Sequence, residues 1–382
     1  MGGDAFDEDD LIAEACEATG LSDFGRDDFR AGLHALARTY ASNPLTEGGQ
    51  RRNRRRLVEL LSTRLRIQNA FRRHPEIREH RIASPMVLTG LPRSGTSALF
   101  NLLARDPAAR PLLLWESKYP DPAEGLEPGD PDPRRDALEE RYARAREQNP
   151  DFTKIHFTSA DTPEECVLIH AYSLSGVQMG FEVMLEPYAS WYRAQDLRPM
   201  YAYYKELLQL LDWQRPGKRW LLKAPAHMWA IDALIETFPD VRVVWSHRDP
   251  LLCTASICSM THWLMASQVE VDKEALGPIV MDFYATSLER GLAARDQADP
   301  ARFVDVTHDE FVHDSLATVE KVYGHFAMEV VPDARAAMEA HIASNPKGKH
   351  GTHEYGLEEF GLVESQVRER FAGYIDRFAI GT

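Results

Sequence analysis

The fold of this chain is decided by the stretch Met86-Val87-Leu88-Thr89-Gly90-Leu91-Pro92-Arg93-Ser94-Gly95-Thr96-Ser97. Its first four residues are apolar or β-branched and predict a short buried strand, and an apolar helical pattern follows Gly95 and continues to residue 103. A tight turn containing two glycines joins the two elements. The first turn of a helix carries free backbone N–H groups and the positive end of the helix dipole. This junction therefore predicts an anion-binding site.

The residue types in the turn favour a phosphate as the anion. Gly90 and Gly95 allow the backbone to approach a phosphate closely, Arg93 supplies a charged fork, and Thr96 and Ser97 add hydroxyl donors. The spacing G-x-x-x-x-G is that of a Walker A loop, but Thr96 stands where that motif has its Lys. Nucleoside triphosphatases use this Lys together with Mg²⁺. The loop thus predicts a phosphate ligand that needs neither.

A second anion-binding element is expected further along the chain. The apolar run 242–247 ends at Arg248, Pro250 opens a helix, and Ser256 follows eight residues after the arginine. Eight residues span a strand end and one to two helical turns. Arg248 and Ser256 can therefore converge on one anion.

These elements resemble the nucleotide site of sulfotransferases that use 3′-phosphoadenosine 5′-phosphosulfate (PAPS), and the spacing is most similar to the bacterial-type branch of the P-loop sulfotransferase superfamily. The resemblance implies that Arg248 and Ser256 hold the 3′-phosphate. It implies that the 5′-phosphosulfate is held by Pro92, Arg93, Ser94, Gly95, Thr96 and Ser97.

A third match lies near the C-terminus. Lys347-Gly348-x-x-Gly351 resembles the family's R-K-G-x-x-G loop, and Pro346 replaces the leading Arg of that loop. The resemblance implies that Lys347 and Gly348 close over the nucleotide.

Strand-like and helical runs alternate along the chain. This pattern predicts an α/β fold of three layers, P-loop-like, with a central parallel sheet flanked by helices. Residues 1–80 are expected to form an N-terminal helical extension, and residues 81–382 the sulfotransferase domain. Strands are expected at 85–89, 112–115, 219–222, 241–246 and 303–306.

Composition excludes several classes of function. The chain has 382 residues and a formal net charge of −15, which argues against nucleic-acid binding, and its basic run 51–56 is typical of the solvated face of a helix. No apolar run is long enough for a membrane span, and no signal-peptide pattern is present. The four cysteines form no C-x-x-C pair and are expected to be reduced, so we expect a cytoplasmic protein. No cluster has metal-ligand spacing, so no metal is expected.

Transfer of a sulfuryl group needs a base for the acceptor proton, and positive charge for the sulfuryl oxygens and the leaving phosphate. Glu116 is the first candidate for the base, because it follows the expected strand 112–115 at the edge where parallel sheets bind ligands. Some sulfotransferase branches have a catalytic Glu at the end of this second strand. The alternative is a surface Glu that follows a strand. Arg93 is expected to help stabilise the developing charge.

Lys223 and His227 are further catalytic candidates, in the run Trp220-Leu221-Leu222-Lys223-Ala224-Pro225-Ala226-His227. The run resembles the K-T-H motif of cytosolic sulfotransferases, whose Lys steadies the transferring group and whose His is the base. Pro225 occupies the position of that His, and His227 lies two residues later.

The pair Glu164 and Glu165 is a third alternative for the base. The same residues also read as a helix start, with Thr162 as N-cap and Glu165 as its capping-box partner.

The sequence therefore predicts an enzyme that moves a sulfuryl group from PAPS to a hydroxyl or amine of a small-molecule, glycan or lipid acceptor and leaves 3′-phosphoadenosine 5′-phosphate (PAP). Two alternatives stay open: a P-loop nucleotide or small-molecule kinase, and a catalytically silent nucleotide-binding protein. The sequence indicates neither the acceptor nor the oligomeric state.

Overall fold

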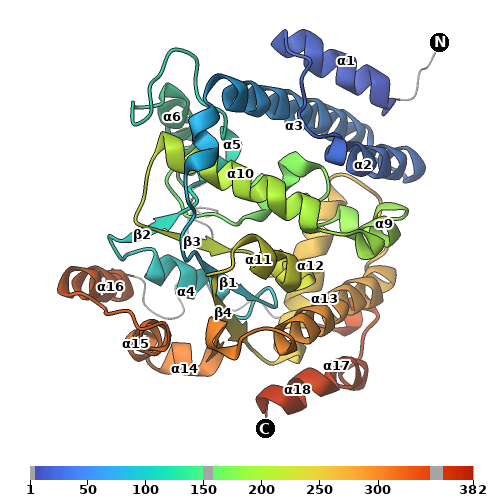
Figure 1. The fold of residues 1–382 in the computed structure, drawn as a ribbon. Coiled ribbons are helices and arrows are strands. Elements are labelled where there is room, and N and C mark those ends of the chain that lie inside the picture. Colours follow the sequence, from blue (N-terminus) through green and yellow to red (C-terminus); the bar gives the residue numbers. More distant parts are fainter. Residues whose placement is uncertain (1–4, 149–157, 345–355, 382) are drawn as a thin grey trace.

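A parallel five-stranded sheet lies at the centre of the molecule, and helices cover both of its faces (Figure 1). The computed structural model describes residues 5–148, 158–344 and 356–381. The strand order is β2-β3-β1-β4-β5, with β1 in the middle. The strands are β1 (Met86–Gly90), β2 (Ala109–Pro111), β3 (Arg219–Lys223), β4 (Arg242–His247) and β5 (Phe303–Thr307). The α/β fold that the sequence predicted is confirmed.

Alternating side chains of the strands build the two cores. In β1, Met86 and Leu88 belong to one hydrophobic cluster, whereas Val87 between them belongs to the other. This is the period of two that a pleated strand imposes, and both sets are apolar because both faces are covered. The first cluster is closed by the helices α4 (Thr96–Leu103), α15 (Ser315–His325) and α16 (Pro332–Ser344). The second is closed by helices that include α3 (Glu47–Arg73), α10 (Arg198–Gln214), α11 (Ile231–Thr237) and α13 (Lys273–Asp296).

The N-terminal part is helical, as expected. Its helices α1 (Glu8–Thr19) and α2 (Arg30–Ser42) lie with α3 on the α10 side of the sheet (Figure 1). Leu33 of α2 belongs to the same hydrophobic cluster as Tyr201 of α10. The division of the chain at residue 80 stays a prediction.

Eight further α-helices lie within the described ranges. They are α5 (Leu114–Lys118), α6 (Pro133–Gln148), α8 (Val167–His170), α9 (Tyr188–Ala194), α12 (Pro250–Ala266), α14 (His308–His313), α17 (Glu364–Arg370) and α18 (Ala372–Phe378). Within the described ranges, no helix has both the length and the apolar character needed to cross a bilayer.

Four of the five expected strands are confirmed to within a few residues, but the strand expected at 112–115 is wrong. The strand lies earlier, at Ala109–Pro111, and the helix α5 begins at Leu114. The backbone N–H groups of Leu114 and Trp115 donate to the carbonyls of Thr162 and Ala160 instead of to a strand. A crossing segment of chain therefore takes the hydrogen bonds that the apolar run would need for a ladder.

The end of β1 leaves no room for a side chain, which yields a first prediction. Gly90 has φ 140°, and a Cβ atom there would lie 2.3 Å from the carbonyl oxygen of Ser246 on β4. We expect Gly90→Ala to lower the free energy of unfolding by about 2–3 kcal/mol. Gly324→Ala in α15 is the control, because a Cβ there meets nothing within 4 Å and alanine favours a helix by about 1 kcal/mol. Equal urea midpoints for the two variants would contradict the expectation.

Candidate active site

The loop between β1 and α4 has the geometry of an anion cradle. Gly95 is its last residue and has φ 92°, and α4 begins at the next residue, Thr96. Arg93 also has a positive φ, 70°, in the middle of the loop. Backbone in these left-handed conformations turns successive N–H groups toward one point, where the positive end of the α4 dipole adds to them.

The second anion element meets this loop. The Arg93 Nε atom donates to the Ser256 Oγ atom at 3.1 Å, and an Nη atom of Arg248 donates to the Arg93 carbonyl at 2.8 Å. The meeting follows from the sheet, since β1 and β4 are paired in parallel and Gly90 is opposite Ser246. The structure thus brings together the loop, Arg248 and Ser256, which the sequence placed about 150 residues apart.

Two buried polar atoms in this place have no hydrogen-bond partner among the described residues: the Ser94 Oγ atom and the Arg248 Nε atom. Buried polar groups in proteins are nearly always paired, so each indicates a missing acceptor or donor. A phosphate offers several acceptor oxygens, and the site already contains two guanidinium groups at Arg93 and Arg248. The residues present therefore fit a phosphorylated ligand.

Lys223 brings a third positive charge to the same edge of the sheet. It is the last residue of β3 and is buried, with its Nζ atom 3.0 Å from the Ser97 Oγ atom at the start of α4. The same Nζ atom lies 2.5 Å from a carboxylate oxygen of Glu165. Lys223 is thus held between the phosphate loop and a carboxylate.

Glu165 lies on a segment that crosses the edge of the sheet. Backbone hydrogen bonds fix the segment on both sides of this residue, because the Glu164 N–H donates to the Leu112 carbonyl and the Cys166 N–H donates to the Lys223 carbonyl. The helix start predicted at Thr162 is wrong, since α8 begins at Val167. Glu165 therefore does not serve as a capping-box partner there, and its carboxylate pairs with Lys223.

Glu164, next to it, is oriented differently. Its Oε2 atom accepts the backbone N–H of Glu165 at 3.1 Å, and burial raises the pKa of its carboxyl group above the usual value.

Glu116 is not at a strand end, where the sequence placed it, but in the helix α5, and its side chain is buried. Its carboxylate accepts two hydrogen bonds from Arg110, at 2.6 and 2.8 Å, one from Arg215 at 2.9 Å and one from the Leu113 N–H at 2.9 Å. Burial favours the neutral acid, but the charges of Arg110 and Arg215 outweigh it and lower the pKa of Glu116. These contacts use the four lone-pair directions of the carboxylate and count against its role as a base. That role stays a prediction.

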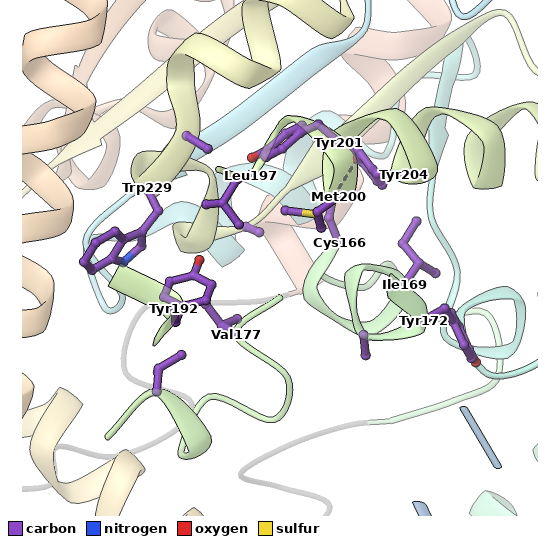
Figure 2. Close-up of a cluster of buried hydrophobic side chains, with 14 of the residues drawn as sticks. Cys166, Ile169, Tyr172, Val177, Tyr192, Leu197, Met200, Tyr201, Tyr204 and Trp229 are labelled. Carbon is purple, nitrogen blue, oxygen red and sulfur yellow. Dashed lines mark hydrogen bonds between the residues drawn. The ribbon is translucent and has the colours of Figure 1, made fainter. Parts of the chain in front are cut away.

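His227 follows Lys223 in the chain, in the 3-10 helix η5 (Pro225–Ala230), and its side chain is fully buried. Its Nδ1 atom is 2.8 Å from the hydroxyl of Tyr201, and burial lowers its pKa to about 3. Tyr201 belongs to a buried cluster that also contains Tyr204 and Cys166, which share a hydrogen bond (Figure 2). This packing inside the core counts against His227 as the base, and that role too stays a prediction.

The other predicted residues have simpler outcomes. Lys347 and Gly348 lie outside the described residues. In the part of the chain that the structure describes, no group of three or more His, Cys, Asp or Glu side chains could hold a metal ion.

One neighbour of the site was missed by the sequence analysis: His308, the first residue after β5. Its only signal in the sequence was its place after an apolar run, which many residues share.

The fold and the loop define an α/β protein with a glycine-containing loop between the central strand and the N-terminus of a helix. The particular family follows from comparison with known proteins. A model of the Sulfotransferase family matches residues 85–333, well over half of the chain, so the chain belongs to this family.

Solved structures agree over nearly the whole chain. The sulfotransferase STF1 from Mycobacterium tuberculosis is 35% identical, with a TM-score of 0.84 over 96% of this chain and 98% of that one. The sulfotransferase STF9 from Mycobacterium avium is 30% identical, with a TM-score of 0.88 over 98% and 97%.

A curated relative matches over a shorter stretch. It is the omega-hydroxy-beta-dihydromenaquinone-9 sulfotransferase Stf3 of Mycobacterium bovis, 22% identical over 170 residues. The match covers 43% of this chain and 42% of the length of that relative.

The contacts of Glu116 predict a structural effect when its charge is removed. Glu116→Gln leaves the guanidinium of Arg110 buried without its carboxylate, and we expect the free energy of unfolding to fall by about 3 kcal/mol. We expect kcat at a permissive temperature to stay within about threefold of the parent value, because the carboxylate is buried and already accepts hydrogen bonds from Arg110, Arg215 and the Leu113 N–H. Urea denaturation and steady-state rates measure the two quantities. Parental stability with a kcat reduced about a hundredfold would instead identify Glu116 as the base.

Proposed function

We propose that this protein transfers a sulfuryl group from PAPS to a hydroxyl or amine of a small-molecule, glycan or lipid acceptor. The observation that carries the proposal is the convergence of Arg93, Arg248 and Ser256 around buried polar atoms that lack partners. Membership of the Sulfotransferase family supports it. The cytoplasm, expected from the cysteine pattern, is the proposed location.

The two ends of the nucleotide are assigned to different elements. The loop residues from Pro92 to Ser97 and the N-terminus of α4 hold the 5′-phosphosulfate, and Arg248 with Ser256 holds the 3′-phosphate. PAPS supplies an activated sulfuryl group, and PAP is the product that leaves. Since an arginine fork binds two phosphate oxygens at once, Arg248 also fixes the orientation of the nucleotide.

Lys223 stabilises the negative charge that develops on the leaving phosphate. Its Nζ atom lies beside Ser97 at the positive end of α4, so the ammonium group and the helix dipole act on the same oxygen atoms. Burial of Lys223 lowers the local dielectric and strengthens this interaction. The Lys223 ammonium group and the N-terminus of α4 are positioned before the reaction, so neither has to reorganise as the charge on the leaving phosphate develops.

Glu165 is the proposed general base. Its side chain is about one-third exposed, so an acceptor hydroxyl can reach it, and its pairing with Lys223 places it next to the phosphate loop. The backbone bonds of Glu164 and Cys166 hold it in position. The base removes the acceptor proton while the acceptor oxygen attacks, and much of the rate comes from this positioning.

Binding of PAP tests the nucleotide assignment. We expect metal-free PAP at about a hundred times its Kd to stabilise the protein by roughly 2.7 kcal/mol, seen as a rise of a few degrees in Tm. The rise should disappear in Arg248→Ala and persist in Arg55→Ala, whose side chain is 72% exposed on α3. A rise with Mg·ATP but none with PAP would contradict the proposal and favour a kinase.

The neighbouring glutamates provide a matched pair for the base. We expect Glu165→Gln to lower kcat at least about a hundredfold, because the acceptor proton loses its base, and to leave the Kd for PAP within about threefold. Glu164→Gln should keep kcat within about fivefold, since Glu164 does not pair with Lys223. Rates are measured with labelled PAPS and an acceptor panel that includes an omega-hydroxylated dihydromenaquinone, because a relative is named for such a lipid. Equal losses in the two variants would refute the assignment.

A further inference from the structure

His308 lies beside Arg248 because of the register between two strands. β4 and β5 are paired in parallel, and their last partners are His247 and Thr307. The residue that follows β4 is Arg248 and the residue that follows β5 is His308, at the same edge of the sheet. His308 is the first residue of α14 and is partly exposed.

The imidazole ring also lies close to the loop between β1 and α4. Its Cδ2 atom lies 3.1 Å from the position that a Cβ atom on Gly95 would occupy. Gly95 is the residue just before α4, so the ring lies next to the N-terminus of this helix. His308 thus lies close to both the 5′ element and the 3′ element of the proposed nucleotide site.

The charges around this ring oppose its protonation. Burial and the positive charge of Arg248 lower the pKa of His308, and only Asp309, on its own helix, acts in the other direction. Asp309 is fully exposed and lies 3.5 Å from the Nδ1 atom, at the limit of a hydrogen bond. Glu310, also on α14, pairs with Lys321 of α15. Among the described residues, no buried carboxylate offsets the positive charge that this ring would carry when protonated.

We propose that His308 is a further phosphate-binding residue, neutral in the free protein and protonated when PAPS or PAP is bound. The inference rests on the proposed function of the site. A phosphate beside the ring supplies the negative charge that the free site lacks, and a charged imidazolium donates from both ring nitrogens. Binding of the nucleotide then takes up a proton from solution.

The direction of the pH effect follows from this linkage. Between the lower pKa of His308 in the free protein and its higher pKa in the complex, the complex holds one proton more than the free protein. Affinity therefore rises as the pH falls through this window, by up to about tenfold per pH unit, and becomes independent of His308 above it. The phosphates of PAP titrate near pH 6 as well. The test must therefore compare variants rather than pH values alone.

Calorimetric titration of the full chain with metal-free PAP at pH 6, 7 and 8 provides the test. At each pH two buffers with different ionisation enthalpies give the number of protons taken up. We expect His308→Gln to bind PAP about tenfold more weakly than the parent at pH 6 and within about twofold at pH 8. Proton uptake at pH 6 should fall by roughly half a proton. His313→Gln, on the exposed side of the same helix, is the control and should behave like the parent.

Three outcomes are decisive. A pH-dependent gap that is confined to His308→Gln supports the inference, and His308→Asn replaces this variant if its Tm shows that it is not folded. The same pH profile and proton uptake in parent and variant would overturn the role of His308 and leave the nucleotide site intact. If the parent binds no PAP at any pH, the proposed function fails, and the inference fails with it.

Discussion

The parallel pairing of β1 with β4 is the constraint on which the site depends. It sets Gly90 opposite Ser246, so closely that only glycine fits, and it brings the loop after one strand against the residue after the other. The Ser246 hydroxyl donates to the Ser94 carbonyl at 2.7 Å, and Arg248 donates to the Arg93 carbonyl. Two segments that are far apart in sequence are thus held together at the proposed nucleotide site.

A second strand pair places Lys223 at the same edge of the sheet. β3 lies on the other side of β1 and ends in Lys223, so the ammonium group meets the loop from the side opposite Arg248. In a chain with a net charge of −15, these few cations make the edge of the sheet locally positive. The carboxylate of Glu165, which pairs with Lys223, is the exception, and it is the proposed general base.

The sequence predicted the features that depend on local pattern. Apolar runs located four strands, and the glycine positions located the turn between β1 and α4, because both signals lie within about ten residues. The run at 112–115 was misassigned, since its apolar character suits a buried strand and a buried helix start equally. Glu116 was judged from that strand, whereas its partners Arg110 and Arg215 are apparent only in the folded chain. Likewise, Glu165 meets Lys223 across 58 residues of sequence, which no local pattern reveals.

The central claim is that one nucleotide bridges the β1 loop and the β4 end. A crystal structure of the protein grown with PAP tests this most directly. The account predicts the 5′-phosphate in the loop from Pro92 to Ser97 and the 3′-phosphate within hydrogen-bond distance of both Arg248 and Ser256. PAP bound elsewhere, or a 3′-phosphate that contacts neither of these residues, would contradict it.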